Sequence, residues 1–285
     1  MKKEHFSEKI FLSAVLLSVF LTLLIFCFMF ILGLPLLEEG NFFQILKNPW
    51  DPDHLIFGIY PMIIGTMAIA FTSIVFAFPL SLGCSAFITV IGPENPGRFL
   101  KRLVQFMTGI PTVIYGFVGI FLLVPIVREV FEYGSGMCIL SAGLLLSLVV
   151  SPTMILLFID SIEQVPKSYL EAVDALGGSK VQKLLYVILP CSRQGILTGV
   201  ILALGRSMGD TLIALMIAGN AVAVPGSVLD SARTLTAHIA LIIAADFDSL
   251  EFKTIFACGI VLYLSTTFFA LTIRFMGTRY MRKKW

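Results

Sequence analysis

The chain has 285 residues, of which 58% are hydrophobic and only 13% are charged, and its formal net charge is +2. Soluble domains carry about 25% charged residues, and a soluble protein of this size has too little interior for so much apolar surface. The composition therefore excludes an ordinary cytosolic enzyme, a disordered chain and a nucleic-acid binder with a basic face. It predicts a polytopic membrane protein, whose building unit is an apolar stretch of about 20 residues.

Six apolar stretches are long enough to cross a bilayer, and solid apolar runs favour helices over the alternating strands of a barrel. The first is expected to be an uncleaved anchor, because it exceeds the apolar core of a signal peptide, about 7–15 residues. In the second, Pro79 is expected to mark a kink or a break, and in the third, Pro111 and Gly116 are expected to allow a kink with close helix packing. The stretches are Ile10–Leu32, Pro61–Ile91, Leu103–Val127, Met137–Ile159, Ile196–Ala221 and Thr254–Met276.

The basic residues are distributed unevenly between the two sides of these spans. Fifteen of the 20 Lys and Arg residues flank the spans on the side of the N-terminus, four lie on the other side, and Arg206 lies inside a span. Cytoplasmic loops carry the excess of Lys and Arg. We therefore expect both termini in the cytoplasm of a prokaryotic cell, with the chain in its inner membrane.

The segment 221–253, expected outside, contains the apolar run Leu235–Ala245, which is too short to span a bilayer as a helix. We expect a re-entrant or surface helix there, packed against the bundle, with His238 as a packed residue rather than a ligand. The expected organisation is an anchor helix and outer loop over 1–56, a core of helices 2–6 over 57–276, and a basic cytoplasmic tail over 277–285. Within the core, the cytoplasmic loop spans 160–195.

Motifs for catalysis and metal binding do not occur in the sequence. The five cysteines show no C-x-x-C spacing, and there is no P-loop, G-x-G-x-x-G or H-E-x-x-H pattern. We therefore expect no catalytic residue, no metal site and no cofactor bound by this chain, and no nucleic acid among its partners.

The long cytoplasmic loop is predicted to contain a short helix, a glycine turn and a second helix. Pro166 suits a first helical turn, Gly177 and Gly178 suit a helix end, and Ser179 suits a cap. Leu170, Val173 and Leu176 are spaced to share one helix face. Such a helix is either an ordinary loop packed on the bundle or a docking helix for a cytoplasmic partner.

The same loop carries a longer pattern. Residues Glu171, Ala172, Gly177, Leu189 and Pro190 fit E-A-A-x3-G-x9-I-x-L-P, with Val173 and Val187 as mild replacements. This pattern resembles the EAA loop of ABC importer permeases, which implies an all-α, six-helix (MetI-like) membrane bundle. The resemblance also implies that the loop helix couples to a separate cytoplasmic ATP-binding subunit, which is where ATP is hydrolysed.

Two charged residues, Arg206 and Asp210, lie inside the fifth apolar stretch. A charge in hydrocarbon costs about 2.5–3.5 kcal/mol even on insertion scales, so these side chains are expected to face protein or a water path. At positions i and i+4 of one helix they are expected to pair. The pair is either a packing lock or part of an anion path, in which the guanidinium offers planar donors to an oxyanion.

The segment from Arg206 to Asn220 decides between these readings, because it resembles the R-x-x-G-E-T…M…G-N segment of phosphate-importer permeases. The segments Phe57–Thr66 and Gly109–Gly116 agree, and the match is to the PstC-type half. The resemblance implies that phosphate passes Arg206 and Asp210, where Asp replaces the usual Glu. Thr211, Asn220, Thr112 and Tyr115 are the further polar residues expected on the path.

The partners implied are a cytoplasmic ATP-binding subunit, an extracytoplasmic phosphate-binding protein and a second permease subunit, PstA-like or identical. Two alternatives stay open at this point. One is a permease for another oxyanion, such as tungstate, molybdate or sulfate, which the EAA pattern does not distinguish. The other is an ion-coupled secondary transporter, which would need no docking loop.

Overall fold

The computed structural model describes the backbone of residues 2–38, 41–247 and 249–282, and the side chains of 8–33, 43–247 and 249–275. The described chain is almost entirely helical, which confirms the predicted all-α class. Within the described residues, six helical segments are long and apolar enough to cross a membrane, the number expected from the sequence. They are Glu8–Gly33, Tyr60–Ile91, Thr112–Phe131, Ile139–Glu163, Lys180–Gly209 and Leu250–Phe275.

The described chain consists of helices and one short pair of strands. Two segments, Phe87–Ile91 and Leu184–Ile188, are π-helical turns. The helices are α1 (Lys2–Glu38), α2 (Asn41–Lys47), α3 (Tyr60–Ala86), α4 (Glu94–Met107), α5 (Thr112–Phe131), α6 (Ile139–Glu163), α7 (Lys167–Ala175), α8 (Lys180–Lys183), α9 (Leu189–Gly209), α10 (Leu212–Ile217), α11 (Leu235–Ile242) and α12 (Leu250–Arg282). Two short strands, β1 (Trp50–Asp51) and β2 (Ile56–Phe57), pair antiparallel around a 3₁₀ turn, Pro52–His54.

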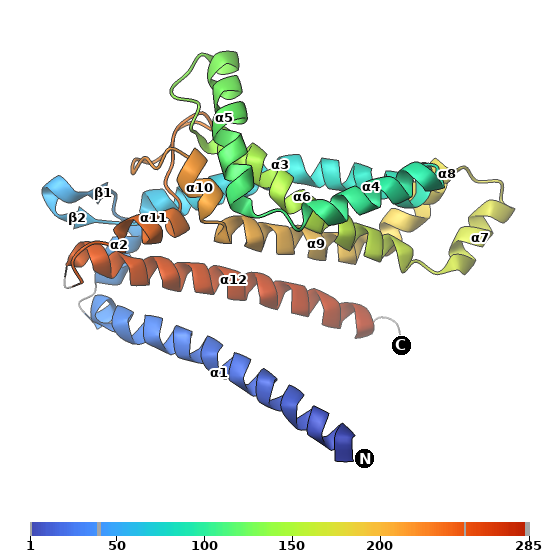
Figure 1. Cartoon of the computed structure of the whole chain (residues 1–285), viewed down its shortest axis with the longest axis horizontal. Helices are drawn as coiled ribbons and strands as arrows, with labels where there is room; N and C mark the ends of the chain where they lie inside the picture. The colour runs from blue at the N-terminus through green and yellow to red at the C-terminus, as the bar shows by residue number, and fades with distance from the viewer. Residues whose placement is uncertain (1, 39–40, 248, 283–285) are drawn as a thin grey trace.

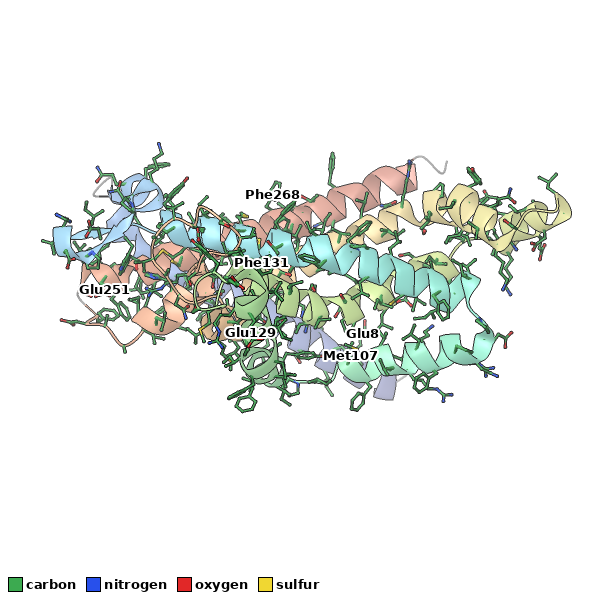
Figure 2. All side chains as sticks on the ribbon, turned by 90° about the horizontal axis from the view of Figure 1, so that it is seen from above. Glu8, Met107, Glu129, Phe131, Glu251 and Phe268 are labelled. Atoms are coloured by element: carbon green, nitrogen blue, oxygen red, sulfur yellow. The ribbon has the colours of Figure 1, made fainter. Side chains whose placement is uncertain are left out.

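Helices α3, α6 and α9 lie side by side in the middle of the bundle, and α12 separates them from α1 at one edge (Figure 1). Both chain ends lie toward the end of the bundle that carries α7, whereas α2, α11 and the strand pair lie at the opposite end (Figure 1). The outside of the bundle is apolar, as a lipid-facing surface requires. Figure 2 labels Phe268 on α12, one of these exposed side chains.

The core is built around α6, the most deeply buried of the six spans. Its Leu145 and Leu146 pack with Ile69 of α3 and Ile213 of α10. Small residues let the backbones approach: a Cβ atom added at Gly143 would lie 2.6 Å from Cγ2 of Thr72. Such close packing drives helix association in lipid, where the surroundings are as apolar as the helix surfaces.

The third apolar stretch, predicted as one kinked helix over 103–127, is two helices. α4 ends at Met107, and α5 begins at Thr112. Pro111 has an extended conformation with ψ 139°, and a residue before a proline is disfavoured in the α region, so the helix ends there. Close packing at Gly116 is confirmed, since an added Cβ would lie 2.7 Å from Sδ of Met216. Pro79 lies inside α3 and does not break it.

The fifth stretch, predicted as one helix over 196–221, is also interrupted. α9 ends at Gly209, Asp210 is extended with φ −73° and ψ 121°, and the short helix α10 follows. The break separates Arg206 from Asp210, the two charged residues that the sequence had placed on one helix face.

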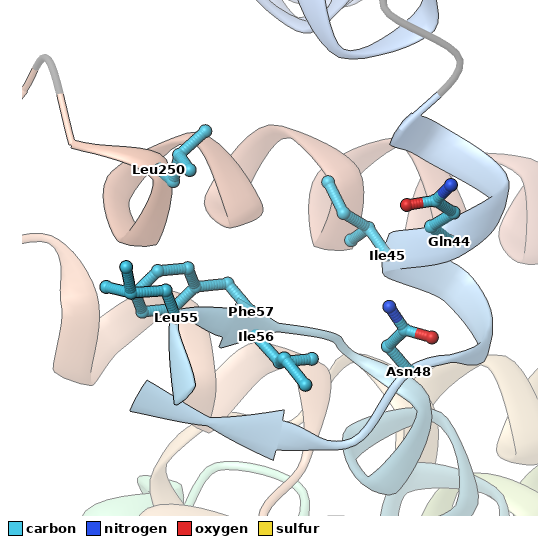
Figure 3. A pocket seen from close by; sticks show the side chains of 7 residues that line it. All are labelled: Gln44, Ile45, Asn48, Leu55, Ile56, Phe57 and Leu250. Carbon is cyan, nitrogen blue, oxygen red and sulfur yellow. The ribbon is translucent and has the colours of Figure 1, made fainter. Parts of the chain in front are cut away.

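The segment 221–253 contains the short helix expected there, α11, which packs against α3 and α12. His238 is a packed residue, as predicted: its side chain is buried, its Nε2 lies 3.0 Å from Oγ1 of Thr254, and the Trp50 ring contacts it edge-on. Beside this cluster, a pocket opens between α2, the strand pair and the start of α12. Its lining residues are Gln44, Ile45, Asn48, Leu55, Ile56, Phe57 and Leu250 (Figure 3).

Candidate translocation site and coupling helix

Arg206 lies in the last turn of α9, and its partner comes from another helix. Its Nη1 donates a hydrogen bond to Oγ1 of Thr153 on α6, at 3.0 Å. The remainder of the guanidinium is open, because Arg206 is exposed in the single chain although it lies in an apolar span. A charged group that faces lipid carries a large cost, so the guanidinium in this position is a candidate for contact with water or with another molecule.

Asp210 does not pair with Arg206, so the predicted i,i+4 ion pair is wrong within the described residues. Oδ1 of Asp210 instead accepts a hydrogen bond from the backbone N–H of Ile213 at 2.9 Å. The physical reason is the chain break: past Gly209 the backbone is extended, so the carboxylate turns to the free N–H groups of α10. Thr211 begins this helix, and its carbonyl accepts from the N–H of Leu215.

Tyr115 and Thr112 lie at the α4–α5 break. Thr112 is the first residue of α5, and the hydroxyl of Tyr115 donates to the carbonyl of Met107 at 3.3 Å, which ties the start of α5 to the end of α4. The Tyr115 ring is half-buried against the core cluster that contains Ile213. The neighbouring Gly116 packs against Met216 of α10, so α5 and α10, the helices that follow the two breaks, lie side by side.

Asn220 lies at the far end of α10 and plays a structural part. It has a positive φ of 57°, and its Nδ2 donates to the carbonyl of Leu215 at 2.6 Å, which closes the end of the helix. Its backbone carbonyl accepts a hydrogen bond from Nε of Arg233. The fold therefore brings Arg206, Asp210 and Thr211 together at one break, with Tyr115 and Thr112 at another, but leaves Asn220 at the opposite end of α10.

Sequence reasoning missed Thr153. It lies in the middle of a long apolar helix, 53 residues before Arg206, and carries no motif. The available signal was a polar residue directly after Ser151 and Pro152 in an apolar run. The sequence does not show that this residue contacts Arg206.

The loop over 160–195 folds as predicted. α7 is followed by Gly177 with a positive φ of 71°, and Ser179 caps α8 in a reciprocal capping box with Gln182. The expected shared face of the first helix is only partly formed. Leu170 packs against the bundle, whereas Leu176 points outward and is 88% exposed, because α7 stands away from the other helices (Figure 1).

The residues of the EAA pattern occupy two places. Glu171 and Ala172 are exposed on α7, whereas Leu189 and Pro190 begin α9, where Leu189 packs into the bundle. Gly177 lies between them at the turn. Nζ of Lys183 on α8 lies 2.6 Å from Oδ1 of Asp174 on α7 and forms an ion pair with it. This pair anchors α7 to the start of the Lys180–Gly209 span.

Two titratable groups of the segment 221–253 have shifted pKa values that follow from their packing and hydrogen bonds. Burial lowers the pKa of His238 to about 3, which leaves it neutral. The Thr254 hydroxyl donates its hydrogen to the carbonyl of Glu251, so its oxygen acts as the acceptor toward His238. Nε2 of His238 is therefore the protonated ring nitrogen and donates to Oγ1 of Thr254. The backbone N–H of Gly226, with the Tyr133 hydroxyl and the N–H of Ser227, holds the pKa of Asp230 below its usual value.

Similarity to known proteins was found at the level of sequence family, curated relatives and solved structures. Residues 94–282 match the family described as "Binding-protein-dependent transport system inner membrane component". The chain is 33% identical over 233 residues to the "Probable ABC transporter permease protein YqgH" of Bacillus subtilis (strain 168), covering 81% of this chain and 75% of the relative. It is 28% identical over 266 residues to the "Phosphate transport system permease protein PstC" of Pasteurella multocida (strain Pm70), covering 86% and 82%.

Solved structures share the fold. A chain of a bacterial alginate ABC transporter in complex with a periplasmic protein aligns with a TM-score of 0.64 at 14% identity, over 97% of both chains. A chain of the MetNI methionine ABC transporter aligns with a TM-score of 0.58 at 17% identity, over 78% of this chain and 95% of that one. At such identities the likeness establishes the MetI-like helical arrangement alone.

Proposed function

Because the chain belongs to the family of binding-protein-dependent transport system inner membrane components, we propose that it is the permease subunit of an ATP-driven importer of inorganic phosphate. The observation that carries the proposal is Arg206, an open guanidinium held by Thr153 at a helix break within an apolar span. A guanidinium presents planar donors that match the oxygens of phosphate. Several relatives named as PstC phosphate permeases support the choice of anion.

The path is proposed to run past the two helix breaks. Thr153 orients Arg206, and Tyr115 and Thr112 add hydroxyl groups at the α4–α5 break. Asp210 and Thr211 shape the start of α10 and keep a carboxylate near Arg206 without neutralising it by contact. An arriving anion therefore finds free donors on Arg206 and need not displace a carboxylate.

The energy is proposed to come from a separate cytoplasmic ATP-binding subunit that docks on α7. The exposed Glu171, Ala172 and Leu176 offer a mixed polar and apolar face to such a groove. From Lys180 to Gly209 the chain is continuously helical, and α9 alone rises roughly 30 Å. A displacement of α7 is therefore transmitted to Arg206 through the Lys183–Asp174 ion pair and along α9.

The remaining partners and the orientation complete the proposal. A second permease subunit, PstA-like or identical, closes the path, and an extracytoplasmic phosphate-binding protein delivers the anion. Both termini are assigned to the cytoplasm. The Lys and Arg bias supports this orientation, and so do the chain ends, which lie toward α7 (Figure 1).

The test is uptake of radiolabelled phosphate by the assembled transporter in proteoliposomes that contain ATP. Arg206→Gln is expected to assemble and hydrolyse ATP but to import phosphate at least about tenfold more slowly, because a charge-assisted contact is lost. Arg128→Gln, which removes an exposed arginine at the end of α5, is the matched control. Wild-type import by Arg206→Gln would refute the role of Arg206, and stronger uptake of tungstate, molybdate or sulfate would reassign the substrate.

A further inference from the structure

A second arginine, Arg233, lies in the segment between α10 and α11. The helices α10 and α11 lie toward the end of the bundle opposite to α7 (Figure 1). Unlike the surface arginines of the loops, it is half-buried. Burial lowers the pKa of its guanidinium and the nearby Glu251 carboxylate raises it, yet an arginine stays charged in a protein. The fold thus keeps a partly desolvated positive charge on the outer side.

The backbone on both sides of Arg233 is fixed. Ala232 donates its N–H to the carbonyl of Ala218 at 2.8 Å, and Thr234 caps α11 by accepting from the N–H of Ala237 at 3.1 Å. The carbonyl of Arg233 itself is pressed against α3, where a Cβ added at Gly65 would lie 2.4 Å away. The backbone that carries the side chain is therefore held in place before any ligand arrives, which lowers the entropic cost of binding.

Most N–H donors of the Arg233 guanidinium are not used within the described part of the chain. Nε donates to the carbonyl of Asn220 at 3.2 Å, which aims the planar group. The two Nη groups carry four more N–H donors, and the described part of the chain supplies them with neither an acceptor nor an ion pair. The Glu251 carboxylate acts on this charge without an ion-pair contact among the described residues, so the Nη donors stay partly desolvated and unpaired, and an anion with several oxygens would remove that cost.

Arg233 is linked structurally to the break that carries Arg206. The hydroxyl of Thr236 donates to the carbonyl of Asp210 at 3.0 Å, so the start of α11 touches the end of α9. The helix α10, with six residues and a rise of roughly 9 Å, lies between Asp210 and Asn220, whose carbonyl aims Arg233. The two arginines are therefore connected through the two ends of one short helix.

We propose that Arg233 is an outer receiving site for a tetrahedral oxyanion, inorganic phosphate, which passes from there to Arg206. The proposal rests on the proposed function and extends it from one cationic site to two in sequence. Two sites of this kind allow an anion to enter at one while the inner site is empty. They also predict different kinetic consequences when each arginine is removed.

The first test uses the wild-type transporter in nanodiscs. Phenylglyoxal modifies accessible arginines, and mass spectrometry reports the extent at each position with and without inorganic phosphate. We expect Arg233 to be modified and phosphate to protect it, while Arg128 is modified equally in both conditions. Modification of Arg233 that phosphate leaves unchanged, or an Arg233 that never reacts, would overturn the outer site.

The second test separates the two arginines by kinetics. Arg233→Gln is expected to raise the half-saturating phosphate concentration about tenfold with a smaller change in maximal uptake, because the contact is made on entry. Arg233→Lys, which keeps the charge, is expected to recover most of this affinity, and Arg128→Gln is expected to behave as wild type. An unchanged half-saturating concentration in Arg233→Gln, or an equal shift in Arg128→Gln, would refute the proposal.

Failure of the outer site and failure of the proposed function give different results. If phosphate is imported but does not protect Arg233, the outer site is wrong and the function stands. If phosphate is not imported, while sulfate, molybdate or tungstate is imported and protects Arg233, the site stands and the substrate changes.

Discussion

Replacement of Thr153 by Val is expected to slow phosphate import without preventing assembly. The two side chains have nearly the same shape, so the change removes chiefly the oxygen that lies 3.0 Å from Nη1 of Arg206. Thr153 is a half-buried residue of α6 that faces α9, and a Val side chain would fill the same space. Arg206 then keeps its charge but loses the contact that orients it toward the path.

The magnitude follows from the kind of bond that is lost. A hydrogen bond to a charged group contributes about 1.5–3 kcal/mol. The lower figure applies, because Arg206 is exposed in the single chain and water replaces the lost partner. A difference of about 1.4 kcal/mol is a factor of ten, so we expect the fraction of correctly oriented Arg206, and with it kcat/KM for phosphate, to fall about tenfold.

The assay is uptake of radiolabelled phosphate in proteoliposomes, with ATP hydrolysis and subunit composition measured on the same preparations. Thr153→Ser keeps the oxygen and is expected to retain most of the activity. Thr198→Val is the matched control, because the Thr198 hydroxyl on α9 bonds to the carbonyl of Gln194 of its own helix and, within the described residues, to no other helix. The reasoning is wrong if Thr153→Val transports like wild type, or if Thr198→Val loses as much activity.

Three further predictions concern packing, the turn and the docking helix. Gly143→Ala drives a Cβ to within 2.6 Å of Thr72 and should destabilise the assembled protein by about 1–3 kcal/mol in thermal unfolding, whereas Gly83→Ala, with nothing within 4 Å, should be neutral or stabilising. Equal effects of the two changes would contradict the packing argument. Gly177→Ala places a Cβ at a φ of 71° and should cost about 1–2 kcal/mol, with Gly177→Asn better tolerated in the same uptake and stability assays. Leu176→Glu adds a charge to an 88% exposed side chain and should reduce co-purification of the ATP-binding subunit while membrane insertion is unchanged; full retention of that subunit would exclude Leu176 from the interface.

Local sequence patterns predicted the elements that depend on neighbours along the chain. The six spans follow from solid apolar runs, and the α7–Gly177–α8 unit follows from a helix period, a glycine and a capping serine. Each of these signals acts within a few residues, where backbone sterics and hydrogen bonding decide the outcome. The helix break at Gly209 was not predicted, although glycine was visible there, because a glycine inside an apolar run is often tolerated.

By itself, the sequence determined the membrane class, the number of spans, the helix–turn–helix loop over 160–195 and the presence of two charged residues in an apolar span. Only the tertiary structure decided what those charges touch. Arg206 meets Thr153 because α6 and α9 pack closely at Gly199 and Gly195, and Asp210 turns away because the chain breaks between them. Apolar burial fixes where a segment lies along the membrane normal. The partner of a polar group depends on how two distant helices pack together, which no local pattern records.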